Sequence, residues 1–239
     1  MTELALPPAL IMVLGAFFIP AENGRGRKRL LLGLPLATLV LVWLVPEGAS
    51  LRLPFLGVEL NPVHATAEGR LFATIFAIMA FAGGLYALPR ASRFELVAAY
   101  VSAGSAIGVT FAGDLITLFI FWELMAVGST AVIVAADTEA ARRAAFRYLL
   151  VHLLGGVLLM AGIIGHWVTT GSLAVEAMRP DSFGTALILI GLLVNAGAPP
   201  VSARIADAYP EASPSGSVFL SAFTTKTAVF ALLVMFPGT

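Results

Sequence analysis

The stretch LITLFIFWELMAVGSTAVIVA, from Leu115 to Ala135, is almost entirely apolar, yet it carries one carboxylic acid, Glu123, near its centre. A run of this length is enough for a helix to cross a bilayer, which takes about 20 residues. A charged group at the centre of such a helix costs at least about 2.5–3.5 kcal/mol, and intramembrane acids usually serve a function. The stretch therefore predicts a membrane-spanning helix with a functional carboxyl group inside it.

The composition of the whole chain agrees with this prediction. Of 239 residues, 59% are hydrophobic and only 12% are charged, which is too little polar surface for a water-soluble domain. We predict an all-α, polytopic helical membrane protein. The net charge of zero gives no electrostatic support for nucleic-acid binding. The absence of cysteine excludes disulfides and cysteine-held metals, and we predict no cofactor and no metal site.

The apolar runs predict eight transmembrane helices in a single domain, residues 1–239. Their ranges are 4–20, 30–46, 68–88, 94–112, 115–135, 146–167, 183–199 and 216–236. The first run has its basic residues after it, so we expect a retained span and not a cleaved signal peptide. The alternating stretch SLRLPFLGVEL, residues 50–60, predicts a short β-hairpin at the membrane surface.

The basic residues of alternate loops predict the orientation. One side carries Arg25, Arg27, Lys28, Arg29, Arg90, Arg93, Arg142, Arg143, Arg147 and Arg204, and the other carries Arg52, Arg70 and Arg179. By the positive-inside rule the larger group faces the cytoplasm, so both termini point outward. We expect an integral protein of a bacterial or archaeal cell membrane.

Lys226 falls in the middle of the eighth predicted span, so the sequence places a base as well as the acid Glu123 at membrane depth. Desolvation disfavours the charged form of both groups, so either can exchange protons near neutral pH. Such a pair suits a proton relay. The alternative is a structural ion pair, or side chains that reach a water-lined crevice. His152, in the sixth span, is either a proton shuttle or a packing residue with one hydrogen bond.

The seventh predicted span is interrupted at its end by Gly197, Pro199 and Pro200. Prolines remove amide donors and stop helices. A helix that is broken beside an ion path exposes backbone groups that bind or hydrate an ion, as in many secondary transporters. The alternative is a helix that simply ends at a loop.

Three motifs together resemble a known family. They are GDLITLFIFWELMAVGSTAVIVA (113–135), RRAAFRYLLVHLLGGVLLMAGI (142–163) and ADAYPEASPSGSVFLSAFTTKTAVFALL (206–233). They are similar to the antiporter-like membrane subunits of Mrp-type cation/proton antiporters, membrane-bound hydrogenases and respiratory complex I, and within that group to the D-type subunits of the Mrp antiporters. The resemblance extends from the third span to the end of the chain.

The resemblance implies roles for individual residues. Glu123 matches a family glutamate that pairs with a lysine on the seventh helix, and Lys226 matches a lysine that passes protons toward the middle of the subunit. Asp207 and Ala208 match the Asp-Ala that follows the seventh-helix break, and Pro200 matches the proline before it. The family's outward termini agree with the orientation predicted from charge.

Two departures from the family pattern change the expectation. The family's seventh-helix lysine falls on Asn195, which cannot carry the proton, so His152 or Lys226 would have to replace it beside Glu123. Family members also contain two inverted five-helix repeats. This chain contains three peripheral helices (1–93) and the first repeat (94–236, spans four to eight). The missing half implies either a fragment or a partner chain that supplies the rest.

We therefore predict a proton-translocating or monovalent cation/proton antiporter subunit of a multisubunit membrane complex, not an enzyme in its own right. Its expected partners are other membrane subunits, protons and the bilayer, while transport of sodium is left open. Protons would enter from the cytoplasmic side near the seventh-helix break and exchange among Lys226, His152 and Glu123. The side chains expected to line the path or hold water there are Asn195, Thr130, Thr224, Thr225 and Thr227.

Two other functions stay open at the level of the sequence. The first is a scaffold role in the same kind of complex, favoured by Asn195 and opposed by the retained Glu123 and Lys226. The second is a redox role in which the chain binds haem or quinone. His152 and His166 lie 14 residues apart on one helix, about 21 Å along its axis, so His64 with His166 is the only pair that can share a haem iron.

Overall fold

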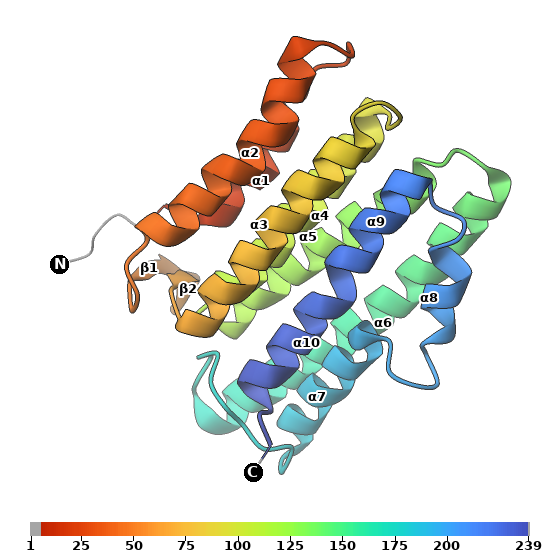
Figure 1. The fold of residues 1–239 in the computed structure, drawn as a ribbon. Helices are drawn as coiled ribbons and strands as arrows, with labels where there is room; N and C mark the ends of the chain where they lie inside the picture. Colours follow the sequence, from red (N-terminus) through yellow and green to blue (C-terminus); the bar gives the residue numbers. More distant parts are fainter. Residues whose placement is uncertain (1–5, 239) are drawn as a thin grey trace.

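The structure, a computed structural model, describes residues 6–238 apart from the side chains of residues 203–205. Its elements in chain order are α1 (Pro8–Ala16), α2 (Arg25–Leu44), β1 (Ser50–Phe55), β2 (Val58–His64), α3 (Ala67–Ala87), α4 (Arg93–Phe111), α5 (Leu115–Val134), α6 (Glu139–Thr170), α7 (Phe183–Ala196), α8 (Ala203–Ala208), α9 (Pro214–Ala222) and α10 (Thr224–Met235). The long helices run roughly side by side (Figure 1).

The predicted helical membrane fold is confirmed in its coarse form. Within residues 6–238, five segments are long and apolar enough to cross a membrane: α3, α4, α5, α6 and the joined segment Pro214–Met235. The other three predicted spans correspond to α1, α2 and α7. Of these, α1 and α7 are short, and α2 begins with a basic first turn.

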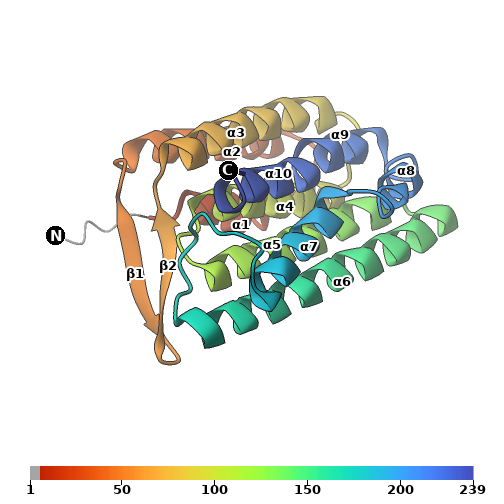
Figure 2. The ribbon, with the colours of Figure 1, turned by 90° about the horizontal axis from the view of Figure 1, so that it is seen from below.

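The core of the bundle is α4, which packs against α1, α3 and α5. It is buried along nearly its whole length. Its neighbours approach closely because it is rich in small residues, among them Ala99, Ala103, Gly104 and Gly108. Pairs of adjacent helices thus surround α4, with α2 and α3 along one side and α6 and α7 along the other (Figure 2).

The predicted β-hairpin is confirmed and lies across one end of the bundle (Figure 2). Leu56 and Gly57 form its turn with positive φ angles of 47° and 86°, the pattern of a tight two-residue hairpin turn. The hairpin is tied to the start of α5 by Asp114. One carboxylate oxygen of Asp114 accepts from the Asn61 amide at 2.5 Å, and the other accepts from the Thr117 amide at 2.8 Å.

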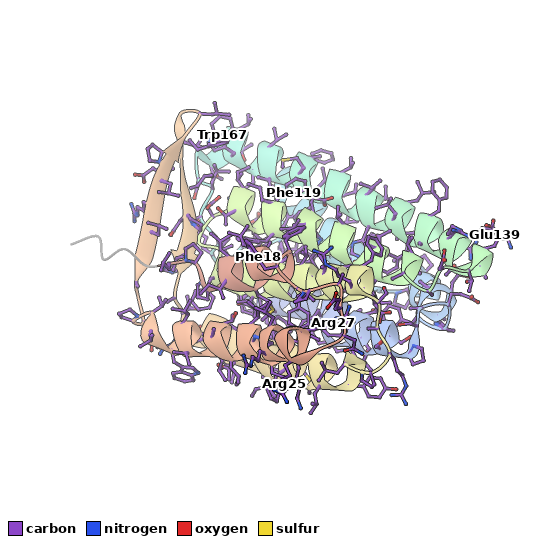
Figure 3. All side chains as sticks on the ribbon, turned by 90° about the horizontal axis from the view of Figure 1, so that it is seen from above. Phe18, Arg25, Arg27, Phe119, Glu139 and Trp167 are labelled. Carbon is purple, nitrogen blue, oxygen red and sulfur yellow. The ribbon has the colours of Figure 1, made fainter. Side chains whose placement is uncertain are left out.

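The longest helix, α6, begins earlier than the predicted span at 146–167. Thr138 caps it, with its Oγ1 accepting from the Ala141 amide at 3.0 Å. The first turns, EAARRAAFR, are polar but rich in good helix formers, so a search for apolar runs misses them. With 32 residues, α6 is about 48 Å long and extends from Glu139 at one end of the bundle to Trp167 beside the hairpin (Figure 3).

The eighth predicted span, 216–236, is not one regular helix, because α9 and α10 are separated at Phe223. The hydroxyls of Thr224 and Thr227 donate to the carbonyl oxygens of Leu220 and Phe223, at 3.1 and 2.9 Å. Hydroxyls that bond back to the preceding turn bend helices. The interruption therefore lies directly before the threonine-lysine-threonine motif.

Glycines allow the backbones of α6 and α7 to approach closely. A Cβ atom added to Gly191 of α7 would lie 2.8 Å from both the Gly155 carbonyl oxygen and the Leu159 amide nitrogen of α6. A Cβ atom added to Gly162 of α6 would lie 2.6 Å from the Ile188 amide nitrogen. Since these neighbours are backbone atoms, the contact has no room for a larger residue.

We expect Gly191→Ala to destabilise the chain by about 1–3 kcal/mol, the usual range for overpacking, because the added methyl group meets backbone atoms of α6. Thermal unfolding of the purified chain in detergent measures the effect. Gly33→Ala is the matched control, since a Cβ atom there has no neighbour within 4 Å. Equal melting temperatures for the two variants would contradict the close α6–α7 contact.

Candidate functional site

Glu123 lies on the face of α5 that packs against α6. Its side chain is half-buried, and a Cβ atom added to Gly156 of α6 would collide with its Oε1 atom. Oε1 is inaccessible to solvent and has no hydrogen-bond partner among the described residues. A buried carboxyl oxygen without a partner is costly. Glu123 therefore occupies a slot that exists only because residue 156 has no side chain.

Asn195 lies in the matching slot on the other side of α6. It is buried, and its side-chain atoms sit directly over Gly155. Consecutive helix residues point about 100° apart, so Gly155 and Gly156 open α6 toward α7 and α5 respectively. The two glycines place the acid of α5 and the Asn195 amide of α7 at the same level of the bundle.

His152, one turn before Gly156 on the same face of α6, is buried. Its Nε2 atom is hydrogen-bonded to the Tyr148 hydroxyl at 3.0 Å, and that hydroxyl donates to Ser129 Oγ on α5 at 3.4 Å. The level of Gly156, and hence of Glu123, is about 6 Å further along α6. His152, Tyr148 and Ser129 therefore form a hydrogen-bonded group at the α5–α6 contact, about one helical turn from the level of Glu123.

Sequence reasoning missed Tyr148 and Ser129. The spacing of Tyr148, His152 and Gly156 by four residues was available in the sequence and places them on one helix face. The partner Ser129 on α5 was not available, because it depends on how the two antiparallel helices align.

The structure does not bury Lys226 within this chain, although Lys226 falls in the middle of a predicted span. Its side chain is exposed on α10, and Nζ donates to Thr225 Oγ1 at 3.2 Å. The cause is the rotation of α10. Thr227 and Ala228 face the core, while Lys226 shares the outer face with Val229 and Leu233, which are 46% and 57% exposed. The structure thus brings Glu123 to α6 and does not bring Lys226 to Glu123.

The predicted threonines are distributed over both faces of their helices. Thr130 Oγ1 donates to the Ala126 carbonyl oxygen at 2.8 Å. Thr225 accepts from Lys226, whereas Thr227 is fully buried on the opposite side. Thr224 is hydrogen-bonded to the Tyr209 hydroxyl at 3.0 Å. These residues therefore do not form one continuous line of hydroxyls.

α7 ends at Ala196, close to the residues that the sequence suggested as an interruption. Gly197, with φ 77°, caps α7, and Pro199 and Pro200 follow in a turn before α8. Asp207 of α8 accepts two hydrogen bonds from the Arg147 guanidinium of α6, at 2.7 and 2.8 Å. These hydrogen bonds hold the pKa of the Asp207 carboxyl below its ordinary value. The pair fastens the segment after α7 to the same helix that carries His152.

Another buried acid, Glu95, was not singled out by the sequence. It lies in the first turn of α4 and is only 4% exposed. Its Oε1 atom accepts from the hydroxyls of Ser213 and Ser215, at 2.8 and 2.5 Å. Because an acid in a helix's first turn is ordinarily a capping residue, the sequence gives no signal of the contact. Glu95 anchors the start of α9 to α4.

The two histidines considered for haem pack against different neighbours. His64, at the end of β2, lies against Gly113, and the His166 backbone on α6 lies against Gly184 of α7. Among the described residues there is no group of three or more histidine and acidic side chains placed to hold a metal ion.

Comparison with known proteins identifies relatives of the chain. The family described as "NADH:quinone oxidoreductase/Mrp antiporter, TM" matches residues 112–238. NADH-quinone oxidoreductase subunit N of Deinococcus radiodurans is 25% identical over 98% of this chain and 51% of its own length. The D subunit of a probable K(+)/H(+) antiporter of Rhizobium meliloti is 27% identical over 59% of this chain and 28% of its own length. By name, the relatives thus include both an oxidoreductase subunit and an antiporter subunit.

The fold is also found in a solved structure. A chain of the membrane-bound sulfane sulfur reductase, an archaeal respiratory complex, superimposes with a TM-score of 0.82 and 22% identity, over 95% of this chain and 52% of that one. This chain therefore spans about half the length of that protein and of the Deinococcus relative.

We expect Asp207→Asn to loosen α8. The pKa of Asp207 lies below its ordinary value of 3.8, so the contribution of the ion pair is complete well above pH 3.8 and is lost as the pH falls through the folded-state pKa. Amide hydrogen exchange in α8 at neutral pH is expected to be about two- to fivefold faster in the variant, a change suited to a partly exposed pair. Asp181→Asn, in the exposed loop before α7, is the control. Unchanged exchange in α8 would argue against the Arg147 contact.

Proposed function

Because the chain belongs to the NADH:quinone oxidoreductase/Mrp antiporter membrane family, we propose that it is a proton-translocating or cation/proton antiporter subunit of a multisubunit membrane complex. Its relatives carry the names of respiratory and antiporter subunits. The chain itself would move protons and perform no redox chemistry, while its complex is either an antiporter or an oxidoreductase.

One observation carries this proposal: Glu123 is an acid within an apolar span whose buried oxygen has no partner. A buried acid with a purely structural role is expected to accept hydrogen bonds from nearby donors, as Asp114 and Glu95 do in this same chain. An acid without a donor is available to take up and release a proton. Water that enters the slot at Gly156 would complete its hydrogen bonds.

The hydrogen-bonded group of His152, Tyr148 and Ser129 would give this acid a route toward water. The group lies between the level of Glu123 and the α5–α6 connection at residues 135–138. That connection lies on the side of the larger group of basic residues, the proposed cytoplasmic side. Protons would enter there, along α6, and the interrupted end of α7 would serve as a second contact with water.

The second half of the route would lie outside the chain. Lys226 is exposed in the middle of an apolar span, on a face shared with Val229 and Leu233. A lysine that faced lipid at this depth would be costly. We propose that another membrane subunit covers this face and receives protons from Lys226, whether or not sodium moves in exchange.

The proposal also includes the number of membrane crossings, the break in α7 and the orientation of the chain. We propose that all eight predicted helices cross the membrane, with α7 broken at Gly197 and both termini outward in a bacterial or archaeal cell membrane. Residues 1–93 would form the peripheral helices, and residues 94–236 the first five-helix repeat. Asn195 keeps the scaffold alternative open, because an amide beside α6 cannot carry a proton as the family's lysine does.

Replacement of Glu123 distinguishes transport from scaffolding. In the assembled complex, Glu123→Gln is expected to reduce proton-coupled transport at least tenfold, because the amide keeps the shape of the side chain but cannot carry the proton. Fluorescent pH measurements in vesicles report the flux. Glu176→Gln, in the exposed loop after α6, is the control. Full transport by Glu123→Gln in an assembled complex would leave only the scaffold role.

The proposed cover of Lys226 is testable by chemical labelling. Lys28 and Lys226 are the two lysines of the chain, so a membrane-permeant amine reagent has two side-chain targets to compare by mass spectrometry. In the purified chain in detergent both are expected to react. In the assembled complex we expect the labelling of Lys226 to fall at least fivefold relative to its labelling in the purified chain. Equal labelling of Lys226 in the two states would mean that no other protein covers α10.

A further inference from the structure

The outer face of α2 carries a basic cluster with no acidic partner. Arg25, Lys28 and Arg29 are exposed, and no carboxylate among residues 6–202 and 206–238 forms an ion pair with any of them. Spacings of three and four residues place the three cations on one face of the helix. Arg25 points away from the bundle, whereas Arg27, between the three in sequence, is turned inward (Figure 3).

Arg27, in the same helix, is a basic residue with a structural role and serves as a comparison. It is 5% exposed, and its guanidinium donates to the carbonyl oxygens of Pro20, Ala21 and Ala91. Its three basic neighbours have no comparable contact. Their position in the first turn also opposes the positive end of the helix dipole, so they do not stabilise α2. The positive-inside rule accounts for basic residues in this loop but not for their alignment on one outward face.

An open apolar groove begins directly beside the cluster. It has a volume of about 420 Å³ and is lined by Arg25, Lys28, Arg29, Leu32, Gly33 and Leu36. Gly33 adds no side chain to the groove, and the space that its Cβ atom would occupy is open. Beyond Leu36 the same outward face continues with Val40 and Trp43, which are 58% and 59% exposed.

The occupant must match both parts of this surface. The charged part is complementary to phosphate, and the apolar part, on an outer helix that packs mainly against α1 and α3, is complementary to acyl chains. A soluble phosphate ester would use only the cations. Basic clusters at the end of a membrane helix attract anionic lipids, each basic residue adding to the affinity.

We propose that the amino-terminal half of α2 binds one anionic phospholipid. Its phosphate is held by Arg25, Lys28 and Arg29, and one acyl chain lies in the groove over Gly33. This site is independent of the proton route, which runs along α5 and α6.

The test is lipid binding to the delipidated full chain in detergent, followed by native mass spectrometry. The probes are dioleoyl-phosphatidylglycerol, dioleoyl-phosphatidylcholine and sn-glycerol 3-phosphate. Phosphatidylglycerol is expected to bind at least tenfold more tightly than phosphatidylcholine. The triple variant Arg25→Gln, Lys28→Gln, Arg29→Gln is expected to lose this preference.

Two further variants separate the site from general charge effects. Gly33→Leu keeps every cation but fills the groove, so it is expected to weaken phosphatidylglycerol binding at least threefold. The matched charge control is Arg90→Gln, Arg142→Gln, Arg143→Gln, which removes three basic residues of the same membrane side and is expected to keep the preference. An equal loss in this control, an unchanged preference in the α2 triple variant, or glycerol phosphate binding as tightly as the lipid would overturn the proposal.

Discussion

The packing around α6 depends on one constraint: a carboxyl group in an apolar helix needs space on the neighbouring helix. Glu123 meets this constraint by packing over Gly156, where α6 offers no side chain. The adjacent Gly155 opens the same helix toward Asn195 on α7. The approach of α5 and α7 to α6, and so the site's geometry, follows from two consecutive glycines.

The contrast among the acids of the chain shows why Glu123 is different. Asp114 accepts from two backbone amides, Glu95 from two serine hydroxyls and Asp207 from an arginine, and each ties two elements together. The buried oxygen of Glu123 accepts no hydrogen bond from the described residues and therefore links α5 to no other element. In a protein interior such a group is expected to have a chemical use, and the hydrogen-bonded His152, Tyr148 and Ser129 lie on the route that we propose for protons.

The sequence predicted what depends on single helices and missed what depends on how helices are rotated and aligned. Apolar length identified the long spans, the hairpin alternation identified β1 and β2, and charge within an apolar run identified Glu123. The exposure of Lys226 was not predictable. α10 carries apolar residues on all of its faces, so the sequence does not indicate which face packs against the bundle. The pairing of Tyr148 with Ser129, and the anchoring of Glu95 to α9, required the packed structure. The break at Phe223 was missed because each threonine alone is compatible with a helix.

We propose that Glu123 exchanges protons along the α5–α6 contact. Infrared spectroscopy of the chain reconstituted in lipid, after transfer to heavy water, measures this exchange at the group itself, with Glu123→Gln used to assign the carboxylic acid band. We expect the band to shift as deuterium replaces the proton, and Tyr148→Phe to slow the shift at least tenfold. A band that never exchanges, or that exchanges at the same rate in both proteins, would rule out this route.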